Sequence, residues 1–289
     1  MKNHIWHIVA ALIVGVWGLT FISTKVLIES GMSPQEIFFA RFLIAYVGIW
    51  FISPRKLFAY DWKDELLLLA SGVTGGSGFF LAQNVAIKIT LVSNVSFIVC
   101  TAPLLTTILA LLIYKKEKAT RWLVGGSLIA LLGVALVVYN GNFVLKISPL
   151  GDFLSLFSAL LWAFYSLIIR KLSGRYSAVF ITRKVFFYGV ITILPFFAVY
   201  PWQFDVSKLL EPAILFNLLY LGVLASLICF VVWNVILKRI GMITASNYLY
   251  LNPVFTLTGS ILLLGEHLTA VALTGCVLIL SGVYLAGRK

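Results

Sequence analysis

The 289-residue sequence has few charged residues, few acidic residues in particular, and few cysteines and histidines. Only 11% of its residues are Asp, Glu, Lys or Arg, whereas a soluble domain has about 25%. This shortage excludes an ordinary water-soluble enzyme. The three cysteines, Cys100, Cys229 and Cys276, lie within apolar segments, which argues against a disulfide framework. We find no metal-ligand or nucleotide-binding motif and therefore expect no metal and no other cofactor.

None of the ten carboxylates and three histidines lies near the middle of an apolar segment. An intramembrane enzyme acting on lipid or peptide would need buried catalytic groups such as paired aspartates, HExxH or a Ser/His arrangement, and these are absent. A channel with a charged ring or a filter-like loop is equally unsupported. Proton-driven transporters usually carry an acidic or histidine relay within the membrane. The sequence therefore predicts transport by facilitated diffusion or exchange, without an acidic proton site at the bilayer midplane.

What the sequence does contain is apolar helix. It is 61% hydrophobic with a mean hydropathy of +1.04, and a bilayer crossing needs roughly 20 apolar residues. Runs such as Leu128–Val138 do not alternate as barrel strands would. The sequence thus predicts an all-α membrane protein with ten transmembrane helices. We place them at about 5–27, 36–53, 66–87, 94–114, 122–140, 151–169, 181–200, 213–237, 244–264 and 269–286.

Basic residues set the predicted orientation. With the amino terminus on one side, that side collects seventeen Lys and Arg residues, and the opposite side collects four. Cytoplasmic loops carry such an excess, so we expect a multi-pass protein of the cell membrane with both termini in the cytoplasm. The same distribution explains the net charge of +12 without a nucleic-acid partner.

The second half of the sequence repeats the first. At an offset of 145 residues Trp17 aligns with Trp162, and at 150 Pro103 aligns with Pro253, with further pairs in the same order. Each repeat has five predicted helices, an odd number, so the second copy enters the membrane from the opposite side. Inverted repeats of this kind are the architecture of many secondary transporters, with substrate near the midplane at the repeat interface. The predicted repeats are residues 1–145 and 146–289.

Several of the paired residues also form a known pattern. They are Trp17, Gly18, Phe21, Lys25 and Arg41, then Pro103, Glu117, Thr120, Gly126 and Gly133, and in the second half Pro253, Glu266, Thr269, Gly275 and Gly282. This pattern resembles the EamA-type proteins of the drug/metabolite transporter superfamily, over nearly the whole chain. The second repeat departs from it at Ala163, in place of glycine, and at Arg170, in place of lysine. The resemblance implies ten helices, cytoplasmic termini and alternating-access movement of small metabolites, often amino acids or related compounds and commonly by export.

Depth along the predicted helices selects the candidate cavity. Trp17 and Trp162 fall near mid-helix, and the prolines are about ten residues into their helices, where they free carbonyls four residues back. Polar residues are costly there unless they pair or line water. The candidate cavity residues are Trp17, Trp162, Tyr250, Asn252, Thr101 and Thr106, and the candidate hinges are Pro103 and Pro253. Interhelical hydrogen bonding and plain packing are the alternatives.

Other polar residues lie nearer the predicted mouths. Because repeat-related residues lie at opposite ends, they suggest gates that open in alternation. An arginine at a gate could attract a substrate carboxylate. Snorkelling of the arginine to lipid headgroups is the alternative, and it is favoured for Arg183. The candidate gates are Arg41, Gln83, Asn84, Arg183 and Asn234. Glu117 and Glu266, in tight loops, are interpreted as structural.

These features together predict a secondary transporter of small, amphipathic metabolites that works in the lipid bilayer and encloses its path within one chain, with oligomers possible. An intramembrane enzyme and a non-transporting sensor or scaffold are the alternatives.

Overall fold

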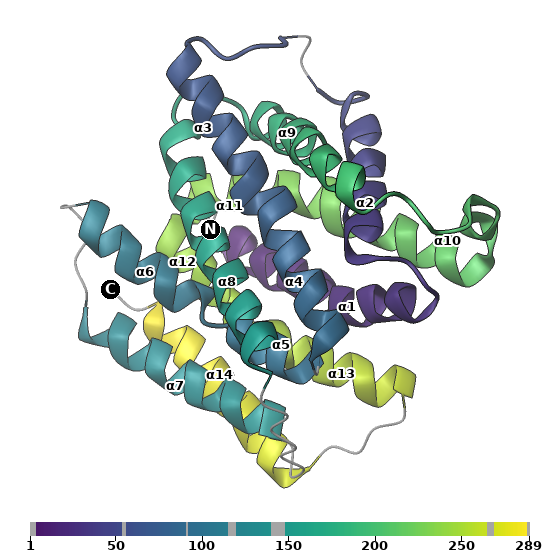
Figure 1. Cartoon of the computed structure of the whole chain (residues 1–289). Coiled ribbons are helices and arrows are strands. Elements are labelled where there is room, and N and C mark those ends of the chain that lie inside the picture. Colours follow the sequence, from purple (N-terminus) through teal and green to yellow (C-terminus); the bar gives the residue numbers. More distant parts are fainter. Residues whose placement is uncertain are drawn as a thin grey trace.

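The computed structural model describes residues 4–53, 56–90, 92–114, 120–139, 148–264 and 269–287, and all regular structure in these ranges is helical. The elements are α1 (His4–Glu29), α2 (Pro34–Ile49), α3 (Trp62–Gly72), η1 (Val73–Ser77), α4 (Gly78–Ile89), α5 (Val92–Val99), α6 (Ala102–Ile113), α7 (Arg121–Tyr139), α8 (Pro149–Leu172), α9 (Ala178–Val199), η2 (Val206–Leu210), α10 (Pro212–Leu219), η3 (Tyr220–Ile228), α11 (Cys229–Ile240), α12 (Met242–Asn247), η4 (Tyr248–Leu251), α13 (Asn252–Leu264) and α14 (Ala270–Ala286). Figure 1 shows them as a bundle of crossing helices. The expected all-α class is confirmed.

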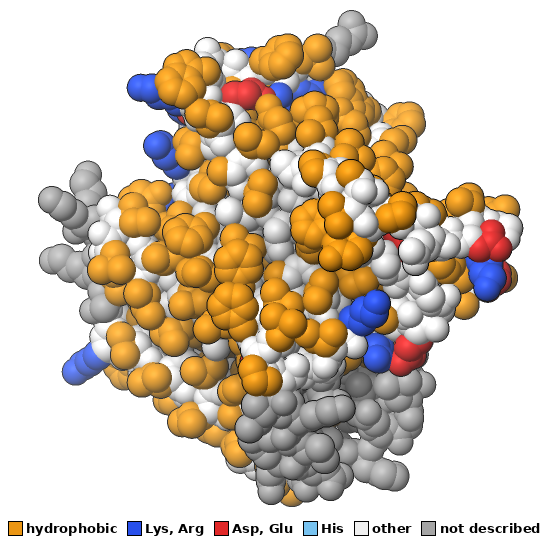
Figure 2. All heavy atoms as spheres, in the orientation of Figure 1, with side chains coloured by type: hydrophobic (Ala, Val, Ile, Leu, Met, Phe, Trp, Pro, Cys, Tyr) orange, Lys and Arg blue, Asp and Glu red, His pale blue; other side chains and the backbone are white. Residues whose placement is uncertain are grey.

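Six helical stretches within the described residues are long and apolar enough to cross a membrane. They are His4–Glu29, Trp62–Ile89, Val95–Ile113, Pro149–Leu172, Ala178–Val199 and Pro212–Ile240, with shorter apolar helices at Arg121–Val137 and Ala270–Ala286. The number ten therefore stays a prediction, since α2 has only 16 residues and the stretch from Met242 to Leu264 is interrupted. Figure 2 shows hydrophobic side chains over most of one face, with charged side chains few and in patches, as lipid exposure requires.

Helix ends follow local capping chemistry. The third predicted span begins at Trp62 rather than residue 66, because the Asp61 side chain accepts a hydrogen bond from the Asp64 backbone N–H at 2.8 Å and caps the helix there. Glu36 and Ser33 form a capping box at the start of α2. At the other end of the chain, His4 and Gly287 line the same pocket, so the two termini lie at one end of the bundle.

Four of the predicted spans contain a break, and the breaks repeat at an offset of about 150 residues. In two of them, α3–α4 and α10–α11, a π-helical segment separates the α-helices, and Gly76 departs from helical geometry at φ −126°, ψ −110°. In the other two, α5–α6 and α12–α13, the chain leaves the α-helix just before a proline.

Pro103 and Pro253 each occupy the second position of a new helix, where a missing N–H costs nothing. The two breaks also touch, since the Cys100 thiol donates to the Leu249 carbonyl at 3.8 Å. The freed carbonyl at Leu249 thus has a partner inside the protein, as an apolar surrounding demands.

Glycines allow the backbones of helices α7 and α14 to approach each other closely. A Cβ on Gly126 would lie 2.6 Å from the Gly282 carbonyl oxygen, and one on Gly282 would lie 2.6 Å from the Gly126 oxygen. Gly133 and Gly275 approach each other reciprocally in the same way, at 2.6 and 2.7 Å. The lower-numbered glycine of α7 thus meets the higher-numbered glycine of α14, so the helices are antiparallel, and the contact has two-fold symmetry between the repeats.

Replacing Gly126 by alanine should destabilise the protein, whereas the same change at Gly125, which has no atom within 4 Å of its would-be Cβ, should not. Overpacking a close contact costs about 1–3 kcal/mol, so thermal unfolding in detergent should show a lower Tm for Gly126→Ala alone. Equal stability of the two variants would contradict the close packing of α7 against α14.

Candidate functional site

Two repeat-related tryptophans meet in the middle of the bundle. The rings of Trp17 in α1 and Trp162 in α8 pack edge to face with centroids 5.3 Å apart. Trp17 also contacts Trp233 and Phe230 of α11, at 5.0 and 5.8 Å, and Trp162 contacts Phe79 of α4 at 5.0 Å. Such pairs stabilise by about 0.5–1.5 kcal/mol beyond area burial.

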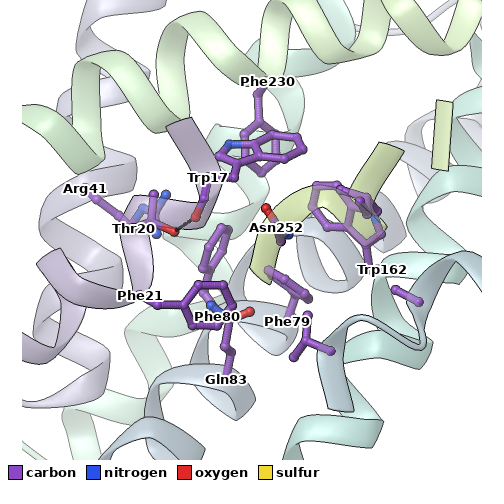
Figure 3. Close-up of a pocket in the computed structure, with 13 residues that line it drawn as sticks. Trp17, Thr20, Phe21, Arg41, Phe79, Phe80, Gln83, Trp162, Phe230 and Asn252 are labelled. Atoms are coloured by element: carbon purple, nitrogen blue, oxygen red, sulfur yellow. Dashed lines mark hydrogen bonds between the residues drawn. The ribbon is translucent and has the colours of Figure 1, made fainter. Parts of the chain in front are cut away.

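The rings of Trp17, Trp162, Phe79 and Phe230 line a cavity between the two repeats (Figure 3). About 50 Å³ of it is available to the centres of water molecules, which is room for a few waters. A larger guest therefore requires the lining rings to move. The lining residues are Trp17, Thr20, Phe21, Arg41, Phe79, Phe80, Gln83, Val99, Ala102, Trp162, Phe230, Leu249 and Asn252.

The lining follows the sequence repeat. Besides the tryptophan pair, Phe80 and Phe230, Val99 and Leu249, and Ala102 and Asn252 are each 150 residues apart. Phe80 and Phe230 were missed at the sequence level, although the 150-residue offset that pairs Asn84 with Asn234 pairs them too. Thr20 and Phe21 were also missed, and they follow Trp17 by three and four residues, on the same helix face.

Polar groups in the cavity fall into two sets. The Trp17 indole N–H donates to the Ala225 carbonyl at 2.9 Å, and the Thr20 hydroxyl donates to the Trp17 carbonyl at 2.6 Å. The Trp162 indole N–H and the Asn252 side-chain oxygen, by contrast, are buried without a hydrogen-bond partner among the described residues. An unpaired donor and an unpaired acceptor thus belong to residues that line one cavity, and a buried unpaired polar atom is costly until a ligand or water satisfies it.

Arg41 lies at the cavity rather than at a mouth. Its side chain is 1% exposed, its Nε donates to the Ser226 hydroxyl at 3.0 Å, and its guanidinium carbon is 4.1 Å from the centre of the Phe80 ring. Ser226 belongs to η3, so the π-helical break positions the hydroxyl. In Figure 3 the guanidinium approaches the lining beside Thr20.

Of the other residues predicted as gates, only Gln83 lines the cavity. Asn84 donates to the Pro34 carbonyl at 3.2 Å. Asn234 accepts from the Tyr165 hydroxyl and donates to the Thr182 hydroxyl, both at 2.8 Å. Arg183 bonds to the Lys56 carbonyl and has the Trp50 ring 4.7 Å away, at an end of the bundle.

The remaining candidates lie beside the cavity. Thr101 donates to the Ile98 carbonyl at 2.7 Å, and Thr106 and Tyr250 are fully buried. None of these three is among the residues that line the cavity. Glu117 and Glu266 lie outside the described residues.

A second polar cluster, which the sequence did not reveal, joins α3 to the α8–α9 connection and to α9. Arg175 contacts Asp64 at 2.6 Å and Asp61 at 3.0 Å, and the Tyr176 hydroxyl donates to Asp64 at 2.7 Å. Burial and this donated bond raise the pKa of Tyr176 to about 12. The Asp64 backbone N–H, and then Arg175, hold the pKa of Asp61 below its usual value.

The cluster continues at Glu65, the next residue of α3. Glu65 accepts bonds from the Lys184 ammonium and the Tyr188 hydroxyl. Asp64 and Lys184 are only 4–5% exposed. Their charges are therefore compensated mainly by their ion-pair partners, Arg175 and Glu65, rather than by water. We call Asp61, Asp64, Glu65, Arg175, Tyr176, Lys184 and Tyr188 the ionic cluster.

Comparison with known proteins shows the family to which the chain belongs. The model of the EamA-like transporter family matches it twice, over residues 4–139 and 149–288. An uncharacterised transporter of Archaeoglobus fulgidus is 27% identical, over 98% of this chain and 97% of the relative. A protein of Salmonella typhimurium named "probable amino-acid metabolite efflux pump" is 28% identical, over 96% and 92%. A crystal structure with 18% identity has a TM-score of 0.72, over 99% and 96%, and this likeness shows the fold alone.

The chain belongs to the EamA-like transporter family. It is a multi-pass membrane protein and a transporter of small metabolites, as the expected resemblance implied.

Replacing Asn234 by leucine should lower stability, because it leaves the buried Tyr165 hydroxyl without its acceptor and removes the bond to Thr182, which keeps only its bond to the Ala178 carbonyl. Each buried unsatisfied group costs about 1–3 kcal/mol. Asn217 lies in the same Pro212–Ile240 stretch but is only half-buried, and its amide bonds only to the Ala213 carbonyl of its own helix. Thermal unfolding should therefore separate Asn234→Leu from the control Asn217→Leu, and matching curves would contradict the role of Asn234 as a helix-to-helix bond.

Proposed function

We propose that the protein is a secondary transporter that moves small amphipathic metabolites, amino acids or related compounds, by alternating access and in the direction of export. The observation that carries the proposal is the central cavity, which is lined by repeat-related pairs of residues where the broken helices meet. Its aromatic walls suit an apolar body, and its unpaired donor and acceptor suit a polar group. The name of the Salmonella typhimurium relative supports both the substrate class and the direction.

Alternating access requires that the two ends of the path open in turn. Breaks in four spans supply the places where helix halves can move against each other. Because the proposed halves, 1–145 and 146–289, are inverted copies, exchanging their conformations would exchange the open and closed ends. The central cavity is lined by residues of a single chain, so a monomer suffices for this cycle.

The two ends differ in this conformation. At the end that we assign to the cytoplasm, the ionic cluster ties α3 to α9. At the opposite end, a pocket with about 920 Å³ available to water centres lies between the α1–α2 connection, α4, α8 and α9. Lys88 and Gln203 are among its polar lining residues. We therefore interpret the conformation as closed to the cytoplasm, with its larger opening outside.

The proposed coupling follows from the residues at the centre. No Asp, Glu or His is among the described residues that line the cavity. Since proton relays in membranes use these groups, we propose facilitated diffusion or exchange.

Counterflow of labelled amino acids in proteoliposomes tests the function. We expect saturable counterflow of at least one compound in the wild type and loss of at least tenfold in Trp17→Ala, because Trp17 lines the cavity and contacts the lining rings of Trp162 and Phe230. Trp122→Ala, a tryptophan outside the cavity lining, is the control. Absence of flux across the whole panel in the wild type would contradict the proposal, and a transport rate that falls to zero without an imposed proton gradient would contradict the coupling.

Arg175→Ala should open the cytoplasmic end more often, because it leaves Asp61 and Asp64 without their cation. A cysteine at buried Ser71 of α3, in a chain whose three native cysteines are alanine, reports this opening. We expect labelling by an impermeant thiol reagent from the cytoplasmic side to become several-fold faster. Lys171→Ala removes an exposed cation at the end of α8 and should leave labelling unchanged. A rate in Arg175→Ala equal to that of the control would show that the ionic cluster does not close this end.

A further inference from the structure

Arg41 is a buried cation with no carboxylate partner among the described residues. The ion pairs among the described residues lie toward the ends of the helices. They are Lys25 with Glu29, Arg175 with Asp61 and Asp64, and Lys184 with Glu65. Arg41 has only the Ser226 hydroxyl as an acceptor, at its Nε, and the face of Phe80. A guanidinium has five N–H donors, so most of its hydrogen-bonding capacity is unused within the described structure.

Such an arrangement is expensive for a purely structural residue. Burying a charge costs several kcal/mol unless it is paired and hydrogen-bonded, and one hydroxyl and one ring face offset only part of that cost. The unused donors therefore point to a partner that is not part of the chain. The cavity, on which Arg41 borders, is where such a partner can enter.

The repeat supplies an internal comparison. Arg183 aligns with Arg41 at an offset of 142 residues, but its guanidinium is bonded to a main-chain carbonyl and has the Trp50 ring nearby, away from the cavity lining. An arginine that only anchors a helix can thus be satisfied locally in this fold. Arg41 is placed differently, at the centre, where Ser226 of the π-helical segment holds Nε and leaves the fork of the guanidinium unbonded.

We infer that Arg41 binds the carboxylate of the substrate, and that this transporter selects small monocarboxylates with an apolar body. The inference rests on the proposed function for the location of the substrate site. A carboxylate matches the guanidinium fork with two parallel N–H···O bonds. Arg41 is the only Lys or Arg among the described lining residues, so a monoanion fits better than a phosphate dianion.

The rest of the lining suits the rest of such a substrate. Phe79, Phe80 and Phe230 face the space that an apolar body would occupy. The unpaired oxygen of Asn252 accepts a hydrogen bond from an ammonium or hydroxyl group near the carboxylate, and the Trp162 N–H donates to the carboxylate or to another acceptor.

Binding, rather than transport, is the sharper test. Wild-type protein in lipid nanodiscs is titrated with L-phenylalanine, L-leucine, 3-phenylpropionate and the corresponding carboxamides, with intrinsic tryptophan fluorescence as the readout because Trp17 and Trp162 form the wall. We expect at least one carboxylate to bind about tenfold or more tightly than its carboxamide, since a charge-assisted bidentate pair is replaced by neutral bonds. In Arg41→Gln the preference should shrink to within about threefold.

Two further variants keep the result interpretable. Arg41→Lys retains the charge without the fork and should keep an intermediate preference. Lys25→Gln removes an exposed cation of α1 and should keep the wild-type preference. Carboxamides that bind as tightly as carboxylates in the wild type, or a preference that survives in Arg41→Gln, would overturn the inference even where counterflow is observed. Carboxylate-selective binding that depends on Arg41 but is accompanied by no flux would support the inference and contradict the proposed transport.

Discussion

The need to satisfy every backbone N–H and C=O inside an apolar surrounding governs this structure. Unbroken helices meet that need by themselves, and irregular backbone is tolerated within a membrane only where protein or a cavity supplies partners. Carbonyls in the irregular segments are bonded across helices, since Trp17 donates to Ala225 of η3 and Cys100 to Leu249 of η4. Tyr220, at the start of η3, donates in turn to the Val16 carbonyl of α1. The breaks therefore lie close together, where they supply partners to one another. The cavity lies at the same place because irregular backbone has to lie against protein or a cavity.

This constraint also explains why repeat-related residues contact one another directly. The reciprocal glycine contacts of α7 and α14 bring two antiparallel backbones together at one side of the bundle, and the tryptophan pair brings α1 and α8 together at the centre. Neither contact leaves room for one repeat to slide past the other. In the alternating-access cycle that we propose, movement is assigned to the helix halves that flank the breaks.

The sequence predicted the helical class, the repeat, and the meeting of Trp17 with Trp162, because composition, register and depth along a helix can all be counted from a chain. It did not predict which side of a helix faces inward. Arg41 was expected at a mouth, from its position along the predicted helix, but it lines the cavity, where its Nε donates to the Ser226 hydroxyl of η3. Tyr250 and Thr106 were expected to line the cavity, but they are buried beside it and are not among its lining residues. The roles of these residues stay predictions.

The repeats differ most where they close the two ends. In the first, α3 contributes Asp64 and Glu65 to the ionic cluster; the residues 150 positions later, in α10, are Ile214 and Leu215, and Ile214 packs in an apolar group with Met32, Ile37 and Leu218. Separating apolar side chains exposes them to water at about 25 cal/mol per Å². Separating buried ions loses their attraction but restores hydration, so the net cost is small. The apolar interface thus resists opening through its buried area alone. At the ionic interface the free energies of the closed and open arrangements are nearly equal. Salt and charged ligands act on the ionic interface and hardly affect its apolar counterpart, so the two halves of the proposed cycle need not have equal free-energy costs.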